Sequence, residues 1–312
     1  MRAAFFRAVL ALAERDERVM LVVGDLGFGV VEPFAARFPA RFLNVGVAEQ
    51  NMTGIAAGLA LSGKIVFTYS IANFATLRCL EQIRNDVCYH NANVKVVAVG
   101  GGLAYGALGS THHATEDLAI MRALPRMVVV APGDAVETEL LTRAVAAEAG
   151  PCYMRLGRAG ERAIHPAHLR LQLGRAIVAR EGSDLTLIST GGLLGTAVQV
   201  AEHLARDQHV ESRVLSMHTV KPVDADAIVA AARDTRALVT LEEHSLTGGL
   251  GSAVAEVLAD AGELKTPVKR LGLPPDFSPH VGSQEYQLMA HGLSHDGIIK
   301  SLKPVLDLLG RW

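Results

Sequence analysis

Two short segments carry the side chains best suited to proton chemistry. Residues 44–60 place Glu49 at the start of a stretch rich in alanine and glycine. A carboxylate is favoured at a helix N-terminus, because the free backbone N–H groups carry partial positive charge. Residues 109–118 begin with small residues and then carry His112 and His113. Imidazoles in a turn after a predicted strand are candidates for proton transfer or ligand binding.

A metal site is not predicted at the histidine pair. His112, His113 and Glu116 lack the H-E-x-x-H spacing of a helical zinc site, and no further ligand can be identified. The alanine- and glycine-rich stretch after Glu49 instead predicts a helix against which another surface packs closely.

The elements that must position these residues follow an alternating pattern. Short apolar runs rich in branched residues predict buried parallel strands; they are 19–23, 64–68, 94–99, 127–130, 152–155, 185–189, 213–216, 237–241 and 268–271. Helical stretches separate them, among which are 53–61, 76–89, 135–148 and 196–205. The alternation predicts an α/β fold of two doubly wound domains.

Glycine-rich turns follow several of the predicted strands. They lie at residues 24–29, 100–102 and 191–192. Because ligands of open α/β sheets bind beyond the carboxyl ends of the strands, these turns mark the edge where a site is expected.

Residues 159–183 interrupt the pattern with a charged stretch that predicts a linker or a short hairpin. We therefore expect a first domain over residues 1–165, and a second over residues 166–312 that includes the linker at its start. The length of 312 residues agrees with two domains of about 150 residues each.

Composition excludes several classes of protein. Thirty basic and 32 acidic residues leave a net charge of −2, so a nucleic-acid partner is not expected. Cys79, Cys88 and Cys152 are too few for a disulfide framework. Arg7 interrupts the first apolar run, and no window approaches about 18 uncharged apolar residues. We expect a cytoplasmic protein that does not span a membrane.

The chain resembles the C-terminal half of transketolase, and in particular the C-terminal subunit of transketolases split between two genes. The resemblance rests on GVAEQNMTGIAAGLA (46–60), FATLRCLEQIRND (74–86), STHHATEDLAIMRALPRMVVVAPGD (110–134) and LGR (156–158). It extends into the second half of the chain, and implies a pyrimidine-binding domain followed by a transketolase C-terminal-like domain.

The resemblance implies thiamine diphosphate as the cofactor. Glu49 matches the glutamate that hydrogen-bonds N1′ of the aminopyrimidine and so promotes removal of the thiazolium C2 proton. Phe74 matches the aromatic residue that stacks on the pyrimidine, and Asp25 matches an aspartate near the thiazolium. Ile71 and Leu77 stand where the family has two further aromatic residues around the cofactor.

The resemblance also implies a partner. The family binds the diphosphate and Mg²⁺ through G-D-G followed by asparagine, and this sequence contains no G-D-G. We expect a second, N-terminal subunit to carry that site, with the two chains forming a heterotetramer.

The substrate residues match the family only in part. His112 matches a histidine that contacts substrate hydroxyls, while Arg2 and Arg158 match arginines that bind the phosphate of the acceptor sugar. Gly100 replaces a histidine and Leu108 replaces an acidic residue that reads a hydroxyl. Gly29 replaces a phosphate-binding serine.

These replacements predict an altered substrate. A site that has lost two hydroxyl-reading side chains should no longer prefer a hydroxyl-rich sugar by the usual margin. We expect ketol transfer from a less hydroxylated, deoxy or otherwise modified ketose to an aldose. On this account Leu108→Asp with Gly100→His should raise activity on ordinary ketose phosphates.

Three alternatives stay open on the sequence. The first is a 2-oxo acid dehydrogenase E1 β-like subunit, and the second is a deoxyxylulose-phosphate-synthase-like subunit. Both would share the fold and the reliance on thiamine diphosphate. The third, of another class, is a non-catalytic regulatory or binding subunit. No role is assigned to His113, His218 or His244.

Overall fold

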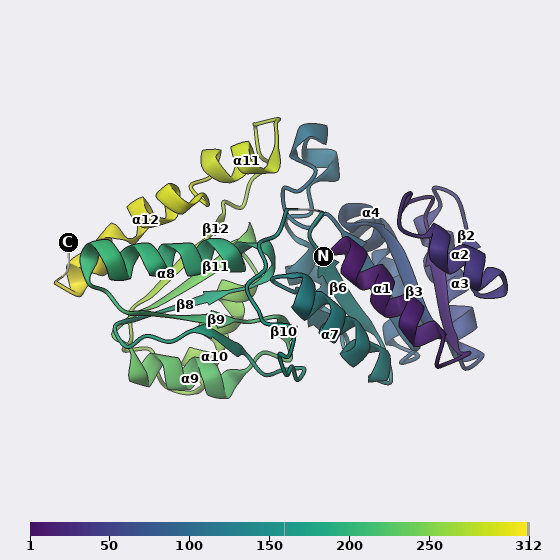
Figure 1. The fold of residues 1–312 in the computed structure, drawn as a ribbon, viewed down its shortest axis with the longest axis horizontal. Coiled ribbons are helices and arrows are strands. Elements are labelled where there is room, and N and C mark those ends of the chain that lie inside the picture. Colours follow the sequence, from purple (N-terminus) through teal and green to yellow (C-terminus); the bar gives the residue numbers. More distant parts are fainter. Residues whose placement is uncertain (159, 311–312) are drawn as a thin grey trace.

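Runs of branched apolar residues form the two mostly parallel sheets of the structure, a computed structural model that describes residues 1–158 and 160–310 (Figure 1). The first sheet has seven strands in the order β10-β5-β6-β4-β3-β1-β2. They are β1 (Val19–Val23), β2 (Phe42–Asn44), β3 (Ile65–Ile71), β4 (Val94–Val99), β5 (Val128–Val130), β6 (Cys152–Leu156) and β10 (Thr219–Lys221). All pair in parallel except β10, which is antiparallel to β5.

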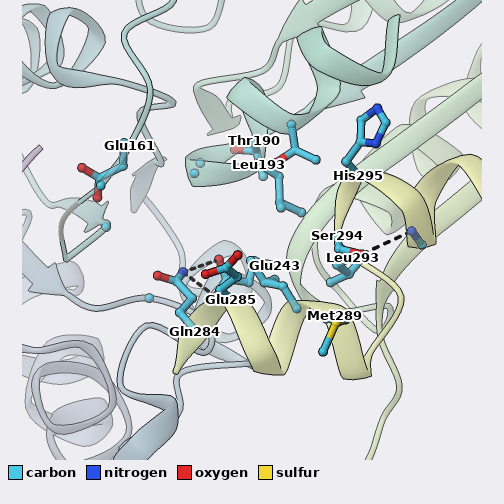
Figure 2. A pocket seen from close by; sticks show the side chains of 18 of the residues that line it. Glu161, Thr190, Leu193, Glu243, Gln284, Glu285, Met289, Leu293, Ser294 and His295 are labelled. Carbon is cyan, nitrogen blue, oxygen red and sulfur yellow. Dashed lines mark hydrogen bonds between the residues drawn. The ribbon is translucent and has the colours of Figure 1, made fainter. Parts of the chain in front are cut away.

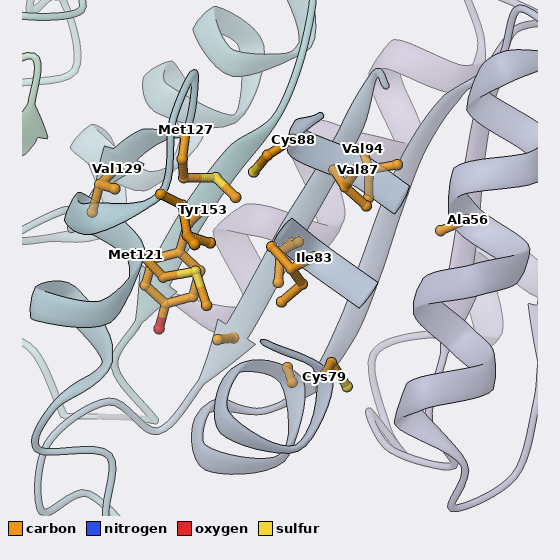
Figure 3. Close-up of a cluster of buried hydrophobic side chains, with 14 of the residues drawn as sticks. Ala56, Cys79, Ile83, Val87, Cys88, Val94, Met121, Met127, Val129 and Tyr153 are labelled. Atoms are coloured by element: carbon orange, nitrogen blue, oxygen red, sulfur yellow. The ribbon is translucent and has the colours of Figure 1, made fainter. Parts of the chain in front are cut away.

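Helices cover both faces of this sheet, because its strands carry apolar side chains on both faces. On one face α1 (Arg2–Ala13) and α7 (Ala135–Ala147) pack in a core that includes Phe5, Phe67 and Tyr69. On the other face α3 (Glu49–Leu61) packs with the core around Ile83 and Tyr153 (Figure 3). The shorter helices are α2 (Glu32–Arg37), η1 (Pro39–Arg41), α4 (Ala72–Thr76), η2 (Leu77–Cys79), α5 (Leu80–Gln82), η3 (Ile83–Cys88), η4 (Gly106–Leu108), η5 (Ser110–His112) and α6 (Asp117–Ala123).

The second sheet has five strands in the order β12-β11-β8-β9-β7. They are β7 (Ile177–Arg180), β8 (Leu185–Ser189), β9 (Ser212–Ser216), β11 (Leu238–Ser245) and β12 (Val268–Leu273). Buried apolar clusters lie on its two faces. The remaining helices are η6 (Gly191–Leu193), α8 (Leu194–Gln208), α9 (Ala225–Asp234), α10 (Leu250–Asp260), α11 (Gln284–Ala290) and α12 (His295–Leu308).

The structure confirms the predicted fold class of two α/β domains and corrects three local predictions. The predicted linker ends in a strand, because β7 pairs antiparallel with β9. The short strands β2 and β10 were not expected. The single helix predicted over 76–89 is broken into η2, α5 and the π-helical η3. Before the break, the Thr76 hydroxyl donates to the Ala72 carbonyl at 2.6 Å, a bond that bends helices.

Among the described residues, no helix is long and apolar enough to cross a membrane. The cytoplasmic location stays a prediction.

Candidate functional site

The residues singled out in the sequence gather at one edge of the first sheet. The central strands β6, β4, β3 and β1 are parallel neighbours, so their carboxyl ends open at the same edge. Arg158 follows β6, Gly100 follows β4, Ile71 ends β3 and Asp25 follows β1. Four segments far apart in the sequence therefore meet where the site was predicted.

Glu49 lies in the first turn of α3 and is only 1% exposed. Its Oε1 accepts a hydrogen bond from the Ser70 hydroxyl at 2.9 Å. Its Oε2 accepts one from Nη1 of Arg78 at 2.8 Å. Gly24 leaves room for this carboxylate, because a Cβ there would lie 3.3 Å from the Glu49 Cγ. A buried carboxylate is thus held at the sheet edge by partners from β3 and η2.

Phe74 belongs to α4 and lies near the Glu49 carboxylate. The Arg78 guanidinium carbon lies 4.5 Å from the centre of the Phe74 ring, so Arg78 contacts Glu49 and Phe74 together. The His112 imidazole meets Phe74 edge-on, with ring centres 5.1 Å apart. Asn73 fixes the histidine loop by donating its amide to the Thr111 carbonyl at 2.6 Å. Glu49, Phe74 and His112 therefore form one connected group.

Asp25 occupies a left-handed backbone conformation at the end of β1, with φ at 52°. Its amide N–H donates to Asn44 Oδ1, and Asn44 Nδ2 donates back to Asp25 Oδ1, both at 3.0 Å. Asn44 ends β2, so the neighbouring strand fixes the aspartate carboxylate. The carboxylate remains exposed.

Several apolar side chains in the turns at this edge of the sheet are open to solvent. Ile71 is half-buried at the start of α4, while Leu77 is exposed beside Arg78. Phe28 and Val47, from the turns before α2 and α3, are 70% and 72% exposed. The described chain therefore leaves these apolar side chains uncovered.

A second group forms around Tyr105, which the sequence analysis did not single out. Its ring fills the space beside Gly100, because a Cβ on Gly100 would lie 2.1 Å from the Tyr105 Cε2. The Arg158 guanidinium carbon lies 5.1 Å from the centre of the same ring. Burial raises the pKa of Tyr105, and the charges of Arg158 and Arg2 act in the opposite direction. Tyr105 therefore stands between Gly100 and the two predicted phosphate-binding arginines.

This arrangement limits the exchange of Gly100 to histidine that would test the substrate prediction. Gly100 has φ at 79°, and Tyr105 already occupies the volume that a larger side chain would need. The predicted exchange of Gly100 to histidine therefore clashes unless Tyr105 also changes. Leu108 has no such constraint, since it is 55% exposed.

The other singled-out residues lie outside these two groups. Gly29 has φ at 83° and open space where a Cβ would point. His113 is buried, and burial lowers its pKa. His218 and His244 are also buried. His244 Nε2 accepts from the Ala119 amide at 3.3 Å, a contact that joins the two domains.

Sequence reasoning missed Ser70, Arg78 and Tyr105 because their importance depends on contacts between segments. One signal was available for Arg78, which follows Phe74 by four residues. That spacing places two side chains on the same face of a helix. No comparable spacing indicates Tyr105 or Ser70.

The described residues fit an aminopyrimidine ring. Such a ring needs a carboxylate for its nitrogen and an aromatic face for stacking, and Glu49 and Phe74 provide both. The planar Arg78 guanidinium already makes the same two kinds of contact. The described chain contains no group of three His, Cys, Asp or Glu side chains that could hold a metal ion.

A separate cavity of about 800 Å³ lies between the two domains (Figure 2). Thr190, Glu243, Gln284 and Lys300 are among its lining residues. Glu243 accepts hydrogen bonds from the Gln284 amide at 2.9 and 3.0 Å. None of the predicted site residues lines this cavity, although Gly101 and Gly157, the neighbours of Gly100 and Arg158, do.

Fold and site together define a two-domain α/β chain in which a buried carboxylate lies near an aromatic ring at the edge of the first sheet. The family described as transketolase, pyrimidine binding domain matches residues 1–161. The family described as transketolase, C-terminal domain matches residues 174–298. The chain therefore belongs to the transketolase family, whose members use thiamine diphosphate.

Several relatives match almost the whole chain. It is 40% identical to a subunit of an apulose-4-phosphate transketolase from Phocaeicola vulgatus, covering 96% of this chain and 95% of that protein. It is 37% identical to a subunit of a 6-deoxy-6-sulfo-D-fructose transketolase from a Clostridium species, covering 98% and 94%. A 1-deoxy-D-xylulose-5-phosphate synthase of Desulforudis audaxviator is 35% identical, covering 95% of this chain and 47% of that protein.

A solved structure agrees with these relatives. It is described as a split gene transketolase in an inactive β4 tetramer and is 38% identical, with a TM-score of 0.88 over 98% of both chains. The resemblance to the C-terminal subunit of a split transketolase is therefore confirmed.

Proposed function

We propose that this chain is the C-terminal subunit of a split transketolase that moves a two-carbon ketol unit from a modified ketose to an aldose. The observation that carries the proposal is the buried Glu49 carboxylate beside Phe74 and His112 at the sheet edge. A non-catalytic subunit would have no need of a buried carboxylate in contact with an arginine at an otherwise open site.

When bound, thiamine diphosphate supplies a thiazolium carbon that can carry the two-carbon unit between sugars. One oxygen of the Glu49 carboxyl group holds a proton at the pyrimidine nitrogen. The Ser70 hydroxyl fixes the other oxygen of that carboxyl group, Oε1. Phe74 supports the ring by stacking, with Ile71 and Leu77 as apolar neighbours. Asp25 places negative charge where the cationic ring of the cofactor is expected.

We assign Arg2 and Arg158 to the phosphate of a sugar substrate, with Tyr105 between them. Guanidinium groups match phosphate oxygens in geometry and charge. We assign His112 to a substrate hydroxyl, because its ring lies against Phe74. Two relatives are named for modified ketoses, apulose 4-phosphate and 6-deoxy-6-sulfo-D-fructose, which supports a modified ketose as the donor.

We further propose an N-terminal partner subunit that binds the diphosphate and Mg²⁺, with domains 1–165 and 166–312 of this chain completing a heterotetramer. The exposed apolar side chains of Phe28 and Val47 support an interface at this edge of the sheet. The related structure, described as an inactive β4 tetramer, supports the need for a second kind of chain.

Activity of the mixed subunits tests this function. Ketol transfer from ketose phosphates, deoxyketoses and sulfoketoses would be measured with thiamine diphosphate, Mg²⁺ and the N-terminal partner. Glu49→Gln should lower kcat by about 10²–10⁴-fold, because the amide cannot hold the proton. Glu139→Gln, on the exposed surface of α7, is the matched control. Equal activity of the Glu49→Gln and control variants would contradict the assignment.

A second candidate, transfer of a decarboxylated pyruvate unit to an aldehyde, is favoured by one observation. Leu108 and Gly100 leave the site without two hydroxyl-reading side chains, and a hydroxyethyl unit carries one hydroxyl fewer. The synthase from Desulforudis audaxviator supports this alternative. Release of CO₂ from pyruvate in the same assay distinguishes it from ketol transfer.

A further inference from the structure

Arg78 joins the two sides of the candidate pyrimidine pocket. Its Nη1 donates to Glu49 Oε2 at 2.8 Å, and its guanidinium carbon lies 4.5 Å from the centre of the Phe74 ring. The guanidinium thus lies between the carboxylate and the aromatic ring. This is the space that a ring contacting both residues would need.

A guanidinium is a close chemical match for an aminopyrimidine in this place. Both are flat, both can hydrogen-bond a carboxyl group, and both can lie against an aromatic ring. The Glu49 Oε1 is already engaged by the Ser70 hydroxyl. A ring approaching Oε2 and Phe74 therefore meets the Arg78 guanidinium first.

The burial of the two partners is unequal. The Glu49 side chain is 1% exposed, whereas the Arg78 side chain is 43% exposed. A buried carboxylate is costly without a partner, so Arg78 stabilises Glu49 while the pocket is empty. Because Arg78 reaches the pocket from the solvent side, it can leave without disturbing the core.

We propose that Arg78 is a placeholder for the pyrimidine: it pairs with Glu49 and covers Phe74 until the cofactor displaces it. This inference rests on the proposed function. It makes Arg78 an internal competitor that weakens cofactor binding, and not a residue that helps hold the cofactor.

Cofactor titration tests the proposal. Thiamine diphosphate would be titrated calorimetrically, in the presence of Mg²⁺, into the complex of this chain with its N-terminal partner. Arg78→Gln should lower the Kd about two- to fivefold, the effect of removing one partly exposed ion pair. Arg84→Gln is the matched control, because the Arg84 guanidinium bonds the neighbouring Asn85 and not Glu49. Its Kd should equal that of the wild type.

Thermal unfolding of the chain without its partner gives a second readout. Arg78→Gln should lower Tm in the wild-type background and have no effect in Glu49→Gln, because the latter removes the charge that Arg78 pairs with. An unchanged or higher Kd for Arg78→Gln would overturn the proposal, as would an equal loss of Tm in both backgrounds. Absence of cofactor binding to the wild-type complex would instead refute the proposed function, while the unfolding series would still test the Arg78–Glu49 contact.

Discussion

At the scale of single residues, the site depends on contacts that a linear sequence does not display. Glu49, Phe74 and His112 could be chosen from motifs, and the structure places the three in one connected group. Their roles with the cofactor and the sugar stay predictions. Tyr105 could not be chosen in this way, because it matters through the space that it fills between other segments, and the one signal for Arg78 is its spacing of four residues from Phe74.

The ring of Tyr105 limits which side chains position 100 can carry, and this leads to a prediction about stability. Gly100→His should lower the free energy of unfolding by about 1–3 kcal/mol, because its Cβ would overlap Tyr105 and overpacking has costs of that size. Tyr105→Ala should remove the part of that loss that comes from the overlap when combined with Gly100→His, while the strain of a side chain at φ 79° remains. Urea unfolding of the two single variants and the double variant measures the coupling.

The outcome also decides how the hydroxyl-reading contacts could be restored. A double variant as unstable as the sum of the single variants would show that Tyr105 is not what excludes a side chain at position 100. If the coupling is found, Leu108→Asp should be combined with both changes before activity on ordinary ketose phosphates is measured.

At the scale of elements, local patterns predicted the long buried strands well. The bounds predicted for β1, β4 and β8 are confirmed without change, because each is a short, mostly apolar run that a glycine or a polar residue follows. The strands β2 and β10 have three residues each, too few for a periodic signal. β10 also joins the sheet of the other domain, a pairing that no local pattern contains.

The segment that leads into the second domain is held by a buried polar network at the start of α7. Asp134 caps the helix and also accepts hydrogen bonds from the amides of Ile164 and His165. Glu137 Oε1 accepts from the Ser216 hydroxyl at 2.6 Å and contacts His165 Nε2 at 2.8 Å. Two carboxylates at the start of one helix thus fix the connecting segment.

This network predicts a pH-dependent stability. Burial lowers the pKa of His165, but the hydrogen bond and charge of Glu137 raise it more, so the net shift is upward. The folded chain therefore binds this proton more tightly than the unfolded chain. The contact stabilises the fold fully below the unfolded pKa of about 6.5, and the stabilisation is lost as pH rises through the folded pKa.

His165→Asn should therefore cost about 1.5–3 kcal/mol at about pH 5.5, and clearly less at about pH 9. Urea unfolding at the two pH values measures the difference. His168→Asn, an exposed residue of the same segment, should show no such dependence. A loss for His165→Asn that is equal at both pH values would contradict the charged contact with Glu137.

At the scale of the whole molecule, the two domains are joined by backbone and by buried charge. β10 extends the first sheet with residues from the second half of the chain (Figure 1). Arg155 of β6 donates to the Glu243 carbonyl at 2.7 Å and to the Ala114 carbonyl at 3.1 Å. The second domain therefore supports the loop that carries the histidine pair, although it holds none of the predicted site residues.

The open surface of α3 supports the expectation that this chain works with a second subunit. The sequence predicted a surface packed closely against the alanine- and glycine-rich helix α3. At Gly54 and Gly58, however, an added Cβ would meet nothing within 4 Å. Val47, two residues before Glu49, is 72% exposed as well. These open surfaces next to Glu49 support the proposed second subunit as the surface that packs there.

The most direct test of the central claim is calorimetric titration of thiamine diphosphate with Mg²⁺ into this chain, alone and mixed with its N-terminal partner. We predict tight binding only in the mixture, and loss of that binding in Glu49→Ala and Phe74→Ala. Tight binding to the chain alone would contradict the split site. Absence of binding to a complex shown to have formed would contradict the role of Glu49 and Phe74 as a cofactor pocket.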